Sequence, residues 1–284
     1  MNSLFLILKD WQILLLIPAL SLLGLLLASW LIRFLEKRHV AFDYDADVID
    51  TATGNTISGA FVILSFSFVL VMGNADRFEA DASREASQIH VLDRMLSLDS
   101  STNALALRHD LLAYTESVSR EEWPILGNDS NPGRGNPATA ASLDRFLDGI
   151  KKLQSDDGTR SQLFPAIVRQ GGGVIESRDL RLLNASTHLP SLFWIVNIVS
   201  LAVVIIVSAL RLLQPSLSRV IVIVVQVIII NMLFSAVLIL DNPFKGQTRI
   251  MTQPLERVIL KIREGVDDGP APGNPAKGSL LPQR

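Results

Sequence analysis

The side chains that most often carry out chemistry in proteins are few in this sequence and are not spaced for catalysis. The 284-residue chain has only four histidines and no cysteine. The absence of cysteine excludes thiolate nucleophiles, disulfides and cysteine metal sites. His90 has no second histidine at ligand spacing, so we interpret it as a surface or packing residue. No nucleophile, base and acid follow the spacing of a known hydrolase. The sequence therefore predicts no catalytic residue, no metal ligand, no cofactor and no enzymatic activity.

Two other stretches resemble ligand-binding loops without completing them. Four alternating acids suggest a calcium loop, but the loop glycine and the closing glutamate are missing: Asp43, Asp45, Asp47 and Asp50. The segment 128–137, NDSNPGRGNP, lacks the lysine and hydroxyl residue of a phosphate-binding loop and the strand before it. We interpret both as solvated loops. A net charge of −2 also gives no reason to expect nucleic acid as a partner.

Long apolar runs are the dominant feature of the chain. Apolar residues make up 49% of it, and several runs approach the length that crosses a lipid bilayer. The sequence predicts an all-α membrane protein with four transmembrane helices in two antiparallel pairs and long amphipathic helices extending from the membrane. The expected parts are a first transmembrane helix (1–35), a polar connection (36–55), a second transmembrane helix (56–73), an extramembrane helical region (74–188), a third transmembrane helix (189–212), a fourth (218–241), a turn with an amphipathic helix (242–264) and a disordered tail (265–284).

The second span is the least apolar of the four and carries the candidate pore residues. Small side chains interrupt it, and in lipid such residues mark a face that packs closely or lines a cavity. One face, at steps of three and four, consists of Ser58, Val62, either Ser65 or Phe66, and Val69. This face either lines a pore or makes ordinary helix contacts, and ordinary packing is the commoner meaning of such a pattern.

Polar residues inside the last two spans form a second candidate group. A short turn joins these spans, so they should be antiparallel neighbours. We expect Asn197 to face Asn231, and Ser208 to face Gln226, with hydrogen bonds across the pair. Such contacts fix helix register, and ion coordination is the alternative role.

Beyond Gly73 the second span continues as an amphipathic helix without a strong breaker. Its apolar stripe is interrupted by Glu85. The commoner meaning of such a pattern is that the stripe is one residue broader and this carboxylate lies at its edge. The alternative is a carboxylate buried beside an arginine of a neighbouring helix. Further helices are expected at 102–118, 139–154, 159–170 and 174–184, with a break at Gly171–Gly173. A last helix with Leu255, Val258, Ile259 and Ile262 on one face should dock on these helices or lie at the membrane interface.

Several of these segments together resemble one family. They are GAFVILSFSFVLV running into ADRFEADASREASQIHVLDRML, the LPSLFWIV entry to the third span, and an LDNPFKG turn whose residues include Asp241, Asn242, Pro243, Phe244 and Gly246. These segments are similar to those of the bestrophin-like family of bacterial membrane proteins, which is named for a distant likeness to bestrophins. Bestrophins are pentameric ion channels whose second span lines an apolar neck and whose helical rods are cytosolic.

The resemblance implies a multi-pass protein of the cell inner membrane that forms homo-oligomers. It makes Ser58, Val62, Phe66 and Val69 neck candidates, makes small ions the transported species and places residues 74–188 in the cytoplasm. Basic residues on the two sides number six against five, so charge alone does not set the orientation. No acidic cluster matches the bestrophin calcium clasp, so calcium gating is not implied. The alternative function is a non-conducting scaffold or regulatory partner whose helical region binds another protein.

Overall fold

The computed structural model describes residues 9–37, 46–99, 101–128, 132–153, 163–213, 216–242, 244 and 252–267. Every regular element in these ranges is helical, which confirms the all-α prediction. The helices are α2 (Asp10–Lys37), α3 (Ala46–Ser97), α4 (Thr102–Ser117), α5 (Trp123–Asn128), α6 (Pro137–Leu153), α7 (Phe164–Ala185), α8 (Ser191–Arg211), α9 (Leu217–Leu240) and α10 (Gln253–Asp267), with a π-helical turn η1 (Val118–Glu122) and a 3-10 turn η2 (Pro132–Arg134).

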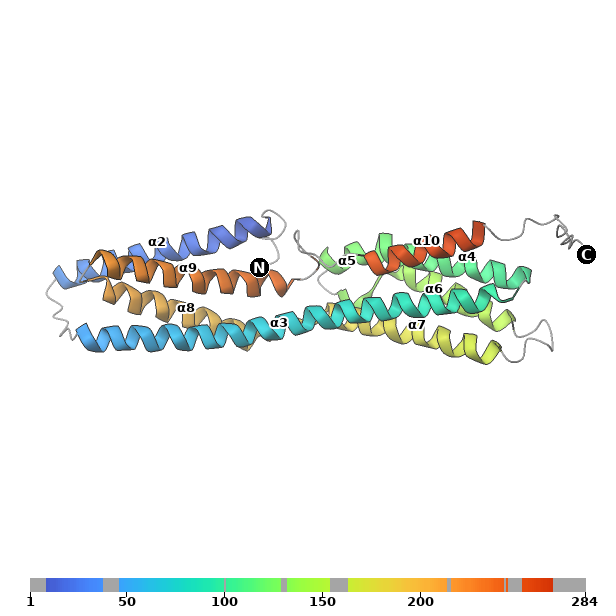
Figure 1. Ribbon diagram of the computed structural model, residues 1–284, viewed down its shortest axis with the longest axis horizontal. Helices are drawn as coiled ribbons and strands as arrows, with labels where there is room; N and C mark the ends of the chain where they lie inside the picture. The colour runs from blue at the N-terminus through green and yellow to red at the C-terminus, as the bar shows by residue number, and fades with distance from the viewer. Residues whose placement is uncertain are drawn as a thin grey trace, which may run out of the picture. The chain divides into compact units, whose positions relative to one another are not determined.

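The chain forms two compact units. The first comprises Met1–Glu79 and Ser186–Ile250, and we call it the membrane unit. The second comprises Ala80–Ala185 and Met251–Arg284, and we call it the helical unit. Helix α3 contributes to both. Figure 1 shows α2, α8 and α9 grouped with the first part of α3, and α4, α6, α7 and α10 grouped with its second part.

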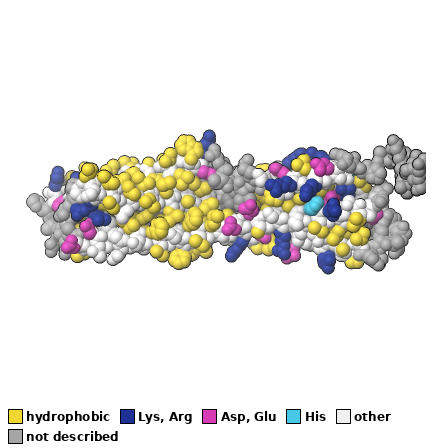
Figure 2. Space-filling model, viewed as in Figure 1, with side chains coloured by type: hydrophobic (Ala, Val, Ile, Leu, Met, Phe, Trp, Pro, Cys, Tyr) yellow, Lys and Arg dark blue, Asp and Glu magenta, His cyan; other side chains and the backbone are white. Residues whose placement is uncertain are grey.

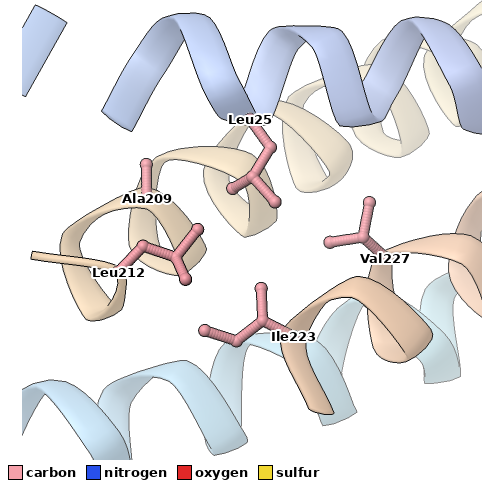
Figure 3. Close-up of a cluster of buried hydrophobic side chains, with 5 residues drawn as sticks. All are labelled: Leu25, Ala209, Leu212, Ile223 and Val227. Atoms are coloured by element: carbon pink, nitrogen blue, oxygen red, sulfur yellow. The ribbon is translucent and has the colours of Figure 1, made fainter. Parts of the chain in front are cut away.

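The membrane unit has an apolar interior and an apolar exterior. Its core includes side chains of α2, α8 and α9 that point toward one another in Figure 3: Leu25, Ala209, Leu212, Ile223 and Val227. Hydrophobic side chains also cover much of its outer surface in Figure 2, and Leu26 and Leu192 are among those exposed. Four described helices are long and apolar enough to cross a bilayer. A surface of this kind is stable in lipid, and the protein is a membrane protein.

Helix α3 is continuous over 52 residues, which confirms the prediction of an unbroken helix through Gly73 and Asn74. It begins at Ala46, so the last ten residues of the expected polar connection are helical. Asp50 lies in its second turn, with its carboxylate 2.7 Å from Arg211 Nε and 3.7 Å from Arg219 Nη2. These ion pairs hold the start of α3 to the end of α8 and the start of α9. Asp43 and Asp45 lie outside the described residues.

The helical unit packs α3, α4, α6 and α7 around buried leucine, isoleucine and phenylalanine side chains. Helix α10 docks on α4, which confirms one of the two alternatives for this helix: Leu255, Val258 and Ile262 are buried. Arg108 of α4 forms an ion pair with Asp93, with 2.7 Å between Nε and Oδ1, and donates from Nη1 to the Gly265 carbonyl at 3.0 Å. Helix α10 continues to Asp267, so the expected disorder does not begin at Gly265, and residues 268–284 lie outside the described ranges.

The predicted break at Gly171–Gly173 is wrong, because these glycines lie inside α7. Close neighbours explain two of them. A Cβ atom at Gly171 would lie 3.2 Å from Ile150 Cδ1, and one at Gly173 would lie 2.9 Å from Gln88 Nε2. The missing side chains let α7 approach α6 and α3 closely, and this packing offsets the low helix propensity of glycine. The predicted helix at 159–170 starts at Phe164, and residues 159–162 lie outside the described ranges.

Gly172 offers a test of this explanation. A Cβ there would meet nothing within 4 Å, whereas a Cβ at Gly149 of α6 would lie 2.5 Å from Leu107 Cδ2. Gly172→Ala should therefore stabilise the protein by up to about 1 kcal/mol through helix propensity. Gly149→Ala should destabilise it by about 1–3 kcal/mol because the buried Leu107 must move. Unfolding monitored by circular dichroism in detergent measures both, and a loss of stability in Gly172→Ala would contradict the account.

Candidate pore-lining face

One face of α3 is buried against the other helices of the membrane unit. Ala60 and Leu64 pack with Leu201 and Val204 of α8 and with Ile230 of α9. About two turns further along α3, Val71 packs with Leu189 and Val237. The four-residue and seven-residue steps between the α3 positions keep them on one side of a helix. The rotation of α3 about its own axis is therefore fixed by α8 and α9.

The four predicted pore residues lie on the opposite side of α3. Val62, Phe66 and Val69 are 52%, 66% and 66% exposed, and Ser58 is exposed as well. Val62 follows Ala60 by two residues, so its side chain points about 160° away from the buried side chain of Ala60 around the helix axis. Contacts within the described part of the subunit therefore leave this face open. Lipid, a second copy of the chain or the interior of a pore are the alternatives for what this face contacts.

The predicted polar contacts between α8 and α9 have different partners from those expected. Asn197 of α8 donates from Nδ2 to Ser67 Oγ of α3 at 2.9 Å. Asn231 of α9 accepts at Oδ1 from Ser21 Oγ of α2 at 2.6 Å, and its Nδ2 donates to the Val227 carbonyl at 2.8 Å. Each asparagine thus joins its helix to one of the first two spans, not to the other asparagine.

The second predicted pair does not form. The buried atoms Ser208 Oγ and Gln226 Oε1 have no hydrogen-bond partner within the described residues. Ser21 and Ser67, which do make contacts, were not singled out as partners from the sequence. The sequence pointed to these two serines only through the general rule that small polar side chains in a span mark a helix-packing face.

The LDNPFKG turn joins the end of the fourth span to the start of the third. Asp241 Oδ1 accepts a hydrogen bond from the Leu189 backbone N–H at 2.6 Å, just before α8 begins. His188 Nδ1 lies 2.9 Å from the Asp241 carbonyl oxygen. Phe244 makes an edge-to-face contact with Phe78 of α3, with 4.4 Å between ring centroids. These contacts give the turn a structural role.

Asn242 is buried and donates from Nδ2 to the Leu238 carbonyl at 3.3 Å, which caps the end of α9. Pro243 and Gly246 lie outside the described residues.

A buried charge network lies in the helical unit and decides the alternatives for Glu85. The Glu85 side chain is fully buried, and its Oε2 lies 2.5 Å from Arg181 Nε of α7. Tyr114 of α4 donates its hydroxyl to Glu85 Oε1 at 2.7 Å. The interpretation in which Glu85 is buried beside an arginine is therefore confirmed. Burial and then the Glu85 carboxylate raise the pKa of Tyr114, which keeps the phenol protonated as a donor.

A second carboxylate, which the sequence did not reveal, completes the network. The π-helical turn η1 places Glu122 so that Oε1 accepts from Arg181 Nη2 at 2.6 Å and Oε2 accepts from Arg178 Nη2 at 2.5 Å. The Asn136 backbone N–H also donates to Oε2, at 3.1 Å. Burial raises the pKa of Glu122, but the charges and hydrogen bonds of Arg181 and Arg178 outweigh it and hold this pKa below its ordinary value.

This network is suited to a structural role. Two arginines face two carboxylates, so the group is neutral as a whole, and Arg181 also lies over the Trp123 ring at 5.6 Å. Among the described residues, no group of three or more histidine, cysteine or acidic side chains could hold a metal ion. The candidate functional feature is the open face of α3, and the network joins α3, α4 and α7 within the helical unit.

Comparison with known proteins identifies the family. A model of the bestrophin-like domain matches residues 19–255, and the chain therefore belongs to the bestrophin-like family. The crystal structure of a bacterial bestrophin homologue from Klebsiella pneumoniae is similar with a TM-score of 0.67 and 12% identity, covering 89% of this chain and 97% of that chain. The crystal structure of a single-substitution variant of that homologue has a TM-score of 0.66 and 12% identity, covering 90% of this chain and 98% of that chain.

A further crystal structure, described as a membrane protein, has a TM-score of 0.66 and 12% identity, covering 90% of this chain and 97% of that chain. At such low identity these likenesses show a shared fold. No curated protein matches the sequence significantly.

Replacing Asn197 tests whether the polar contacts do more than set register. Asn197→Val removes the bond to Ser67, but Ser67 Oγ also lies 3.1 Å from the Ile63 carbonyl and keeps an acceptor. The loss should therefore be small, about 0.6 kcal/mol. Unfolding of the purified protein by increasing denaturing detergent measures it. A loss of several kcal/mol would contradict a register-setting role.

The low pKa of Glu122 predicts an acid-sensitive helical unit. A carboxylate whose folded-state pKa is depressed stabilises the fold above its ordinary pKa of 4.5 and loses that contribution as pH falls below it. Thermal midpoints should drop with acidification in this range. Glu122→Gln should be less stable at neutral pH by about 3–5 kcal/mol, because Arg178 and Arg181 lose a buried counter-ion, and its acid dependence should be flatter.

Asp148→Asn is the matched control, because its pair with Lys151 is exposed and of little consequence for stability. An unchanged acid dependence in Glu122→Gln would contradict the assignment.

Proposed function

We propose that the protein is a homo-oligomeric channel of the cell inner membrane that passes small ions. In this proposal the α3 helices of several copies surround an axis, and Ser58, Val62, Phe66 and Val69 form an apolar neck. The observation that carries the proposal is the orientation of α3: its packing face is buried by α8 and α9, and the predicted pore face points away from both.

The chemistry of this face suits a gate. Large apolar side chains that converge on a narrow passage expel water from it. An ion then meets a high free-energy barrier, because it would have to lose its hydration shell to enter. Phe66 is the bulkiest of the four and would set the narrowest point. Ser58 lies two turns before Phe66 and would keep one end of the neck wettable. Small movements of α3 would then switch the passage between dry and hydrated states.

The family supports the same function and suggests its orientation. The chain belongs to the bestrophin-like family and shares its fold with a bacterial bestrophin homologue. By analogy with bestrophins, the helical unit lies in the cytoplasm. A cysteine placed at exposed Ser87 and labelled in intact cells and in inverted vesicles tests this orientation.

A non-conducting scaffold is the second candidate function. Large apolar side chains are exposed on the helical unit, including Leu98, Leu183 and Leu260. Such side chains could contact another protein. In that case the membrane unit serves as an anchor, and the open face of α3 contacts lipid or a neighbouring subunit. No enzymatic role is proposed.

Purified protein in planar bilayers distinguishes the two candidates. Phe66→Ala should increase the current or its open probability several-fold, because it widens and wets the neck. Leu27→Ala is the matched control: it also truncates an exposed apolar side chain of the membrane unit, on α2, and should leave the current unchanged. Silence of the wild type and of Phe66→Ala, with oligomers confirmed, would support the scaffold.

A further inference from the structure

The exposed face of α3 carries a line of residues that extends beyond the apolar neck. Positions seven apart on an α-helix drift by only about 20°, so they lie almost above one another. Starting from Val62, this line runs back to Asn55 and forward to Val69 and Asp76. All four side chains are exposed, and all belong to the membrane unit. The line thus passes from an amide through two apolar residues to a carboxylate.

The neighbours of Asp76 do not share this line. Arg77 and Glu79 are eight and ten residues from Val69, which turns each of them about 80° away from it, in opposite directions. Gly73 lies between Val69 and Asp76, and a Cβ atom there would meet nothing within 4 Å. Asp76 is therefore the first charged residue after the neck on the side of α3 that faces the proposed axis.

We propose that Asp76 makes the channel selective for small cations, an inference that rests on the proposed function. Each copy would contribute one carboxylate at the same level, about 10 Å beyond Val69 along the helix. The Debye length is about 8 Å at physiological ionic strength, so the electrostatic effect of this ring is confined to ions near it. The ring would therefore act on ions at the end of the pore where it lies. It concentrates hydrated cations beside the neck and repels anions.

The two ends of the neck differ in this respect. At the other end, Asn55 occupies the corresponding position with an uncharged amide, which gives no comparable preference. Selectivity is therefore assigned to the Asp76 end alone. The apolar neck supplies the barrier, and the carboxylates decide which ions reach it. The expected ligands are alkali cations such as K⁺ and Na⁺.

Reversal potentials of purified full-length protein in planar bilayers, under a potassium chloride gradient, test the inference. The wild type should prefer K⁺ to Cl⁻, and Asp76→Asn should lower that permeability ratio several-fold. Glu79→Gln is the matched control, because it removes the same charge three residues away and off the line. It should leave the ratio close to that of the wild type. Size-exclusion profiles of the variants show whether each one still assembles.

The outcomes separate the inference from the proposed function. A conducting wild type with an unchanged ratio in Asp76→Asn overturns the selectivity role and leaves the channel intact. Selectivity for Cl⁻ in the wild type also overturns it. Equal effects of Asp76→Asn and Glu79→Gln would indicate a general surface-charge effect and would contradict the special position of Asp76. A silent wild type, with oligomers confirmed, overturns the channel and the inference together.

Discussion

Helix α3 contributes one unbroken backbone to both units, and this constraint organises the rest of the structure. In lipid, a helix is one of the few ways to pair every backbone N–H and C=O, so the span cannot unfold locally without a large cost. The same helix continues into the helical unit, where its apolar stripe needs partners to bury it. Helices α8 and α9 cover one face in the membrane unit, and α4 and α7 supply partners for Glu85 and Gln88 in the helical unit. These contacts leave the face of α3 with Val62, Phe66 and Val69 exposed.

Polar contacts determine how the helices are aligned with one another, and they add little to the free energy of folding. The contacts of Asn197 and Asn231 lie within the membrane unit, where hydrogen bonds contribute modestly but restrict the register of neighbouring helices. In the helical unit, Arg181 is fully buried and bonds to two carboxylates from distant parts of the sequence. A buried ion network is seldom stabilising relative to apolar packing, but the loss of any one partner is costly. Both sets of contacts therefore favour one packing over its alternatives.

The sequence predicted well those features that depend on local patterns. Long apolar runs gave the four membrane helices, the absence of breakers gave the continuous α3, and the step pattern of Leu255, Val258 and Ile262 gave a docking face. Features that depend on distant partners were missed. The glycines of α7 looked like a break because the close approach of Ile150 and Gln88 is invisible in the sequence.

The same limit applies to the polar contacts. Asn197 and Asn231 were assigned to each other because a short turn joins their helices, whereas they form hydrogen bonds with Ser67 and Ser21. Glu122 was not singled out, since its position depends on the π-helical turn and on arginines 56 and 59 residues away. The role of the four pore candidates stays a prediction, because it depends on contacts between copies of the chain.

A high-resolution image of the purified protein in lipid nanodiscs tests the central claim most directly. The account predicts several copies around one axis, with Val62, Phe66 and Val69 of every α3 directed toward a central opening. A single copy would contradict it, and so would an assembly in which these three side chains face the surrounding lipid.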